Sequence, residues 1–144
     1  MRQSFDGERL KNFMAFEKLK VGLKNSAELT VKISDTAKEM GSGSLNVLAT
    51  PTMLCLMEKA AADLAEENLP QEMTSVGILL NVKHTAPTPV GMKIYAEATL
   101  AEIDERKLKF EVAAFDERGE IGRGTHERFI VNREKFQAKA DGKQ

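Results

Sequence analysis

The chain has 144 residues, of which 42% are hydrophobic and 30% charged, and its formal net charge is −1. Such a composition is typical of one globular domain with its own apolar core. The balance of 21 basic and 22 acidic residues argues against a protein that binds nucleic acid through an overall positive charge. A local basic patch that holds a compact anionic ligand is still allowed.

Cys55 is the only cysteine, so an internal disulfide is impossible and a reducing compartment is expected. No apolar run approaches the roughly 20 residues of a membrane span, and the N-terminus is charged where a signal peptide would be apolar. The two histidines and scattered acids show no metal-ligand spacing. We therefore expect a cytoplasmic protein without a metal, a cofactor, a nucleic-acid partner or membrane contact.

The first elements in chain order are a weak helix and a strand. Residues 8–20 carry apolar side chains at helical spacing, which predicts either an arm that packs on a partner subunit or a frayed tail. Apolar residues then alternate with polar ones from Ala27 to Ile33, which predicts a half-buried strand. Residues 35–46 contain Gly41-Ser42-Gly43-Ser44 and predict a flexible loop.

One strong helix is predicted from Thr50-Pro51 to about Asn68. Threonine is a good N-cap, proline suits the first helical position, and Pro70 prevents continuation. Lys59 and Asp63 are predicted to form a solvated pair on the outer face. The opposite face carries an apolar stripe made of Met53, Met57, Ala60 and Leu64.

Four strands are predicted after the helix, over residues 76–84, 94–100, 108–114 and 121–132. Short turns join the last three strands, which indicates antiparallel pairing. The chain is thus α+β, with one long helix packed in a curled antiparallel five-stranded sheet, the hotdog arrangement. We divide it into an arm (1–20), the folded domain (21–140) and a disordered tail (141–144).

Glu58 and His84 lie where polar groups are unusual. The helical neighbours of Glu58 are all uncharged, so its carboxylate is either a perturbed acid/base group or a side chain that reaches solvent at the edge of the stripe. His84 shares a strand face with Val76, Ile78 and other apolar residues. It is either bonded to a carbonyl at the edge of the core or a general acid/base that partners a carboxylate.

Further candidates are weaker. Thr50 has a capping role, but a hydroxyl at a helix N-terminus could also stabilise an oxyanion. Gly77 interrupts a strand, which often marks close approach of a ligand or another backbone. Arg123, His126 and Arg128 are ordinary surface residues or a site for a phosphate or a carbonyl.

Three segments together resemble the fluoroacetyl-CoA thioesterase family, a hotdog group: LATPTMLCLMEKAA (48–61), TSVGILLNVKHTAPTPVGMKI (74–94) and EIGRGTHERFIVNREKFQAKA (120–140). The resemblance implies that Thr50, Glu58 and His84 are catalytic, and that Gly77 and Arg128 contact the substrate. The family's namesake has an aromatic lid before its catalytic threonine, where this chain has Met40-Gly41-Ser42-Gly43-Ser44-Leu45. Fluoroacetyl specificity is therefore not expected.

The resemblance implies hydrolysis of a short-chain acyl-CoA to the free acid and CoA, and we expect a homodimer with its active sites at the subunit interface. Since Glu58 lies eight residues after Thr50, roughly 12 Å along the helix, we expect Thr50 of one subunit to face Glu58 and His84 of the other. An enoyl-CoA hydratase of the same fold is an alternative, although its Asp-x-x-x-x-His pattern is absent here. A non-catalytic acyl-CoA-binding module is a third reading.

Overall fold

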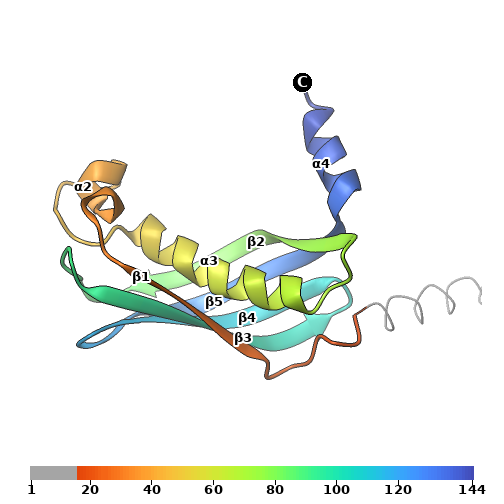
Figure 1. The fold of residues 1–144 in the computed structure, drawn as a ribbon, viewed down its shortest axis with the longest axis horizontal. Helices are drawn as coiled ribbons and strands as arrows, with labels where there is room; N and C mark the ends of the chain where they lie inside the picture. Colours follow the sequence, from red (N-terminus) through yellow and green to blue (C-terminus); the bar gives the residue numbers. More distant parts are fainter. Residues whose placement is uncertain (1–15) are drawn as a thin grey trace, which may run out of the picture.

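The computed structural model describes residues 16–144, which form one antiparallel five-stranded sheet with a long helix across one face (Figure 1). The strand order is β1-β3-β4-β5-β2, so β1 and β2 are the two edges of the sheet. This confirms the predicted hotdog architecture. The strands are β1 (Lys24–Thr30), β2 (Met73–His84), β3 (Lys93–Asp104), β4 (Lys107–Asp116) and β5 (Gly119–Asn132).

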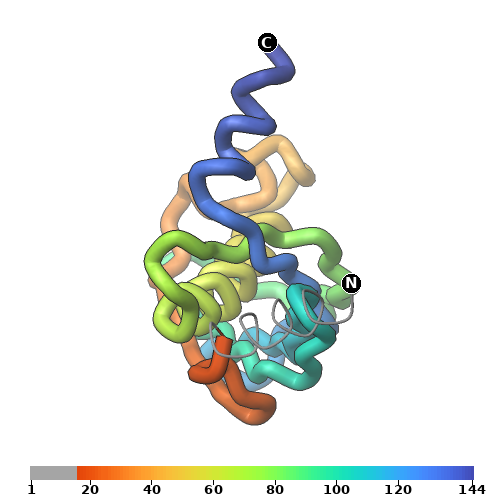
Figure 2. The backbone as a smooth tube through the Cα atoms, turned by 90° about the vertical axis from the view of Figure 1, so that its right-hand side faces the viewer, coloured from red at the N-terminus to blue at the C-terminus, as the bar shows by residue number. Residues whose placement is uncertain are grey.

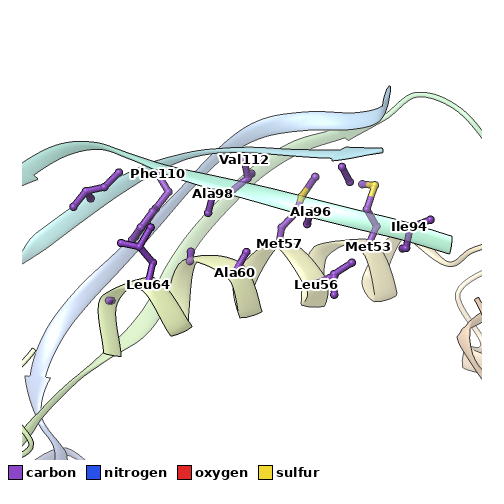
Figure 3. Packing of buried hydrophobic residues seen from close by; sticks show 14 of the residues in the cluster. Met53, Leu56, Met57, Ala60, Leu64, Ile94, Ala96, Ala98, Phe110 and Val112 are labelled. Atoms are coloured by element: carbon purple, nitrogen blue, oxygen red, sulfur yellow. The ribbon is translucent and has the colours of Figure 1, made fainter. Parts of the chain in front are cut away.

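Helix α3 (Thr50–Glu67) packs its apolar stripe against β3 and β4 (Figure 3). Met53, Met57 and Ala60 on the helix are completely buried, as are Ala96 and Ala98 on β3. Alanines on both surfaces let the helix approach the sheet closely, and each large buried side chain contributes roughly 1.5–3 kcal/mol of transfer free energy. This packing fixes α3 relative to the strands that carry the other candidate residues.

The two ends of α3 differ in how well the sequence predicts them. Its C-cap is Asn68, as predicted, and the Lys59–Asp63 ion pair forms with a distance of 3.0 Å. Its N-cap, however, is Ala49, without a side-chain capping bond, and Thr50 is the first helical residue. The prediction that Thr50 caps the helix is therefore wrong, which leaves its hydroxyl free for another partner.

The segment predicted as a loop contains two short helices. They are η1 (Ile33–Asp35) and α2 (Ala37–Met40), and Thr36 between them is fully buried. The Thr36 hydroxyl donates to the carbonyl of Ile33 and accepts from the amide of Glu39. These bonds hold α2 in place ahead of α3, while the following Gly–Ser run is exposed.

Strand β2 does not keep the alternation that the sequence suggests. A register shift between Gly77 and Leu79 interrupts its pairing with β5, so that Gly77 pairs with the buried Arg128 and Leu80 with the buried His126. The prediction that Val76 shares a face with Leu80 and His84 is wrong, because the bulge shifts the alternation by one residue and places Ser75 and Gly77 on that face instead. Ser75, before the bulge, is buried instead.

The described chain begins with residues that pack on the core and ends after a helix. Phe16 and Leu19, from the predicted arm, pack on the core of their own subunit, while residues 1–15 of the arm lie outside the described residues. Helix α4 (Arg133–Asp141) follows β5 and extends away from the sheet (Figure 2). The sequence reading did not predict α4. Within residues 16–144, no helix is both long and apolar enough to cross a membrane.

Candidate active site

The candidate residues form two groups along α3. The first group lies at the N-terminus of the helix, where the Thr50 hydroxyl oxygen is 2.7 Å from Nδ1 of His84 at the end of β2. Both residues line a pocket of about 320 Å³ together with Ala37, Ser42 and other residues of the segment that carries α2. This pocket therefore has a hydroxyl and an imidazole side by side in its wall.

The surroundings of the His84 imidazole favour its neutral form. Burial lowers its pKa below the ordinary value, although a backbone bond to Ala86 acts in the opposite direction. Its other nitrogen, Nε2, is buried and has no hydrogen-bond partner in the part of the chain that the structure describes. The side-chain hydrogen bond of His84 within that part is with the Thr50 hydroxyl, through Nδ1.

The second group surrounds Glu58, about two turns further along α3. Oε2 of Glu58 is 3.4 Å from Nη1 of Arg128 and 4.0 Å from Nε2 of His126, both on β5. The Glu58 side chain is 40% exposed, whereas that of Arg128 is 8% exposed and that of His126 is fully buried. The Glu58 carboxylate is therefore partly exposed, and its Oε2 contacts the buried guanidinium of Arg128.

Gly77 lies directly beneath the Glu58 carboxylate. A Cβ atom at this position would come within 2.6 Å of Oε2 of Glu58 and 3.3 Å of the His126 ring. The sequence indicated a close approach at Gly77, and the structure identifies the approaching group as a side chain of the same chain. Glycine is thus required for the carboxylate to rest between β2 and β5.

Arg123, His126 and Arg128, which the sequence analysis grouped on the last strand, have different surroundings in the structure. Arg123 is exposed and pairs with Glu120 at 2.7 Å, so it is ordinary surface. His126 and Arg128 are buried beside Glu58, together with Ser75, whose hydroxyl accepts from Nε of Arg128 at 2.8 Å. Sequence reasoning missed Ser75, because a lone serine in a strand carries no distinguishing pattern.

One expectation about the site is corrected. His84 was expected to face Glu58 with Thr50 supplied by another subunit, but Thr50 and His84 are bonded within one chain. Glu58 instead contacts Arg128. Across residues 16–144, no group of three or more potential ligands could hold a metal ion.

The chain is similar to known thioesterases in both sequence and fold. A family model described as fluoroacetyl-CoA-specific thioesterase matches residues 31–134. The fluoroacetyl-CoA thioesterase of Streptantibioticus cattleyicolor is 41% identical over 93 residues, which cover 65% of this chain and 67% of that protein.

Solved structures agree with the sequence match. The crystal structure of the fluoroacetyl-CoA thioesterase FlK superposes with a TM-score of 0.82 at 32% identity, covering 88% of this chain and 98% of that one. A hot-dog-like protein from Thermanaerovibrio acidaminovorans shares the fold, with a TM-score of 0.80 at 22% identity over 88% of this chain and 94% of that one. The chain therefore belongs to the fluoroacetyl-CoA-specific thioesterase family and is a hotdog-fold thioester hydrolase.

Proposed function

We propose that this protein hydrolyses short-chain acyl-CoA thioesters to the free acid and CoA. The observation that carries the proposal is the Thr50 hydroxyl, held 2.7 Å from His84 at the edge of a pocket at the N-terminus of α3. Support comes from FlK, variants of which were crystallised with acetyl-CoA and with fluoroacetate and CoA. We place the protein in the cytoplasm, since its single cysteine is free and exposed.

The proposed chemistry assigns one role to each group. Glu58 either removes a proton from the attacking water or attacks the carbonyl itself, after which water hydrolyses the acyl-enzyme. The Thr50 hydroxyl and the free amides at the helix N-terminus stabilise the acyl oxygen as it becomes negative. His84 orients the Thr50 hydroxyl. The C–S bond breaks, and CoA leaves as a thiol once it has taken up a proton.

Within one chain, Glu58 is too far from Thr50 for both to act on one carbonyl. Roughly 12 Å of helix separates the two residues along the axis of α3. A two-fold dimer resolves the distance, because its interface brings equivalent patches of both subunits together. We propose that Thr50 and His84 of one subunit share a site with Glu58 of the other.

The free edge of β2 is the surface that supports such a dimer. Ile78 and Leu79 on this edge strand are 51% and 45% exposed, and an unpaired edge with exposed apolar side chains favours pairing with another strand. An antiparallel pairing of two β2 strands about a two-fold axis at Asn81, with the bulge between Gly77 and Leu79 retained, would set Gly77 of one subunit opposite the partner subunit's His84. That register would bring the Glu58 group of one chain to the Thr50–His84 pair of the other.

The lining of the pocket supports the proposal that the substrate carries a small acyl group. Its lining side chains are mostly small, and none is aromatic except for the His84 imidazole. They are Ala37, Ser42, Val47, Leu48, Thr50, His84, Thr85, Ala86 and Pro87. Gly77, beside the Glu58 carboxylate, is proposed to border the substrate, as the family resemblance implies.

Thiol release from a series of acyl-CoA substrates tests the proposed activity. Acetyl- through hexanoyl-CoA are each incubated with the protein, and free CoA is detected with a thiol reagent. We expect turnover to be highest with the shorter acyl chains. Hydration of crotonyl-CoA without thiol release would support the hydratase alternative, and binding without either reaction would support a non-catalytic module; both results would reject the proposal.

Mixing of inactive variants tests the shared site. Thr50→Ala and Glu58→Ala homodimers should each be nearly inactive, whereas random reassembly should restore about a quarter of wild-type activity, since about half of the dimers are hybrids with one intact site. The matched control mixes Thr50→Ala with His84→Ala. Because one subunit supplies both Thr50 and His84 to a site, every site of these hybrids carries one lesion. That mixture should therefore recover no activity. Equal recovery in both mixtures, or none in a first mixture shown by tagged pull-down to contain hybrids, would reject the shared site.

A further inference from the structure

Ser75 fixes the Arg128 guanidinium from two directions. Nε of Arg128 donates to the Ser75 hydroxyl at 2.8 Å, and Nη2 donates to the Ser75 carbonyl at 2.9 Å. Both residues are buried, with exposed fractions of 7% for Arg128 and 8% for Ser75. Two bonds to one residue restrict both rotation and translation of the planar guanidinium.

His126 completes the support of the guanidinium. Its Nδ1 lies 2.8 Å from the carbonyl of Leu79, which can only accept, so Nδ1 carries the proton. Nε2 is therefore an acceptor in the neutral ring, and Nη1 of Arg128 lies 3.2 Å from it. The tautomer follows from the contacts, and it lets His126 Nε2 accept from Nη1, the nitrogen of Arg128 that also contacts Glu58.

Glu58 is the group that this arrangement holds. Nη1 of Arg128 also reaches Oε2 of Glu58, at 3.4 Å. In the described part of the chain, no hydrogen bond is made to the second oxygen, Oε1, and the carboxylate is partly exposed. One oxygen is thus held by Arg128 while the other makes no hydrogen bond within the described residues, as a base or nucleophile requires.

We propose that Ser75, Arg128 and His126 form a positioning network that holds Glu58 in its reactive orientation. The inference rests on the proposed function, in which Glu58 performs the chemistry. It gives Arg128 a role different from the substrate contact that the family resemblance implies. The nearly complete burial of the guanidinium and its contacts with Ser75, Glu58 and His126 leave little of it available to a ligand.

Ser75→Ala is the mildest test, because it removes only the hydroxyl and retains the carbonyl bond. We expect kcat for acetyl-CoA to fall about tenfold, since small displacements of a catalytic group are costly, while KM changes less than about twofold. Arg128→Lys keeps the charge but loses the fork, and should lower kcat further. Thr74→Ala is the matched control: Thr74 is the neighbouring residue, its hydroxyl bonds Glu66, and kcat should not change.

Introducing Ser75→Ala into the Glu58→Gln variant shows whether Ser75 positions Glu58 or contacts the substrate. If Ser75 acts through Glu58, Ser75→Ala should lower the residual rate of the Glu58→Gln variant less than about twofold. A tenfold loss in both backgrounds, or a rise in KM at unchanged kcat, would show that the network contacts substrate and would overturn the proposal.

An NMR measurement made without substrate tests whether the network positions Glu58, independently of whether the protein hydrolyses acyl-CoA. The carboxyl ¹³C resonance of Glu58 should shift in Ser75→Ala and in Arg128→Lys, and remain unchanged in Thr74→Ala. If the wild-type protein releases no CoA from any acyl-CoA, the proposed function fails while these shifts still report whether the network holds Glu58. An unchanged Glu58 resonance in correctly folded Ser75→Ala and Arg128→Lys would overturn the positioning role itself.

Discussion

The Thr50 hydroxyl oxygen lies 2.7 Å from Nδ1 of His84, although the two residues are 34 positions apart in the chain. Because Ala49 is the N-cap, the hydroxyl is not used to begin the helix. If Thr50 donates its proton to the acyl oxygen, its oxygen must accept from His84, so the proton of the neutral imidazole must reside on Nδ1. The proposed role of Thr50 thus specifies the tautomer of His84.

Replacement of Thr50 tests this pairing. Thr50→Val keeps the shape of the side chain and removes the hydroxyl, so we expect kcat to fall about 100-fold, as for other oxyanion donors. Thr50→Ser retains the hydroxyl and should stay within about tenfold of wild type. The ¹⁵N chemical shifts of His84 should show a protonated Nδ1. A protonated Nε2, or equal kcat in Thr50→Val and wild type, would remove the oxyanion role.

Gly77→Ala should damage activity while leaving the fold intact. The added Cβ would lie 2.6 Å from Oε2 of Glu58, which is the far end of a flexible side chain and can move away. We expect the melting temperature to change by only a few degrees and kcat to fall at least about tenfold, because the carboxylate is displaced. Steady-state kinetics and thermal unfolding measure the two effects.

The mechanism of the Gly77→Ala loss is checked by repeating it in a Glu58→Gln background. If the methyl group acts by displacing the carboxylate, it should cost little further activity there. A full additional loss in that background would mean that Gly77 contributes to activity independently of Glu58.

The sequence predicted most of the sheet and helix but not the pairing of the site residues. The apolar stripe of Met53, Met57, Ala60 and Leu64 and the alternation in the strands specify which faces are buried, and these local periods are readable. Whether His84 meets Thr50 or Glu58 depends on where β2 ends relative to α3, which no local pattern contains. The Ser75–Arg128 bonds connect positions 53 residues apart for the same reason.

Two errors have local physical causes. Strand β2 was read with unbroken alternation, and a bulge between Gly77 and Leu79 shifted the faces beyond it. Helix α4 was missed because it buries no residue and therefore shows no apolar stripe. Its start does have a signal, since the Asn132 side chain caps the helix by accepting from the amide of Lys135.

Stability should fall as the pH decreases below about 6.5. Burial is the main cause that lowers the pKa of His126, and the charge of Arg128 adds to it. In the unfolded chain a histidine binds a proton near pH 6.5, whereas the folded protein resists protonation until a lower pH. Below about pH 6.5 the unfolded state therefore binds more protons, and the free energy of unfolding decreases as the pH falls.

Urea unfolding at pH 7.5, 6.5 and 5.5 measures this effect. His126→Gln removes the titrating ring, so the stability difference between wild type and this variant should narrow as the pH falls. His84 also has a pKa lowered by burial and contributes in the same direction in both proteins. A difference that stays constant across the three pH values would show that His126 does not contribute to the acid sensitivity.

Fluoroacetyl-CoA should not be strongly preferred over acetyl-CoA. The pocket beside Thr50 is lined by Ala37, Ser42 and Val47, in a segment with no aromatic residue to form a lid. A single fluorine in such a pocket changes binding by only about 1–3 kcal/mol. Competition between the two substrates measures the ratio of their kcat/KM values, and a preference beyond about a thousandfold would require another discriminating element.

The central claim is that the Glu58 carboxylate performs thioester hydrolysis, and CoA release by Glu58→Gln tests it most directly. Asp63→Asn removes a carboxylate from the exposed face of the same helix and serves as the control. We expect Glu58→Gln to lose at least about 100-fold in kcat while circular dichroism shows the native fold, and Asp63→Asn to retain wild-type turnover. Near-native turnover by a folded Glu58→Gln protein would contradict the account.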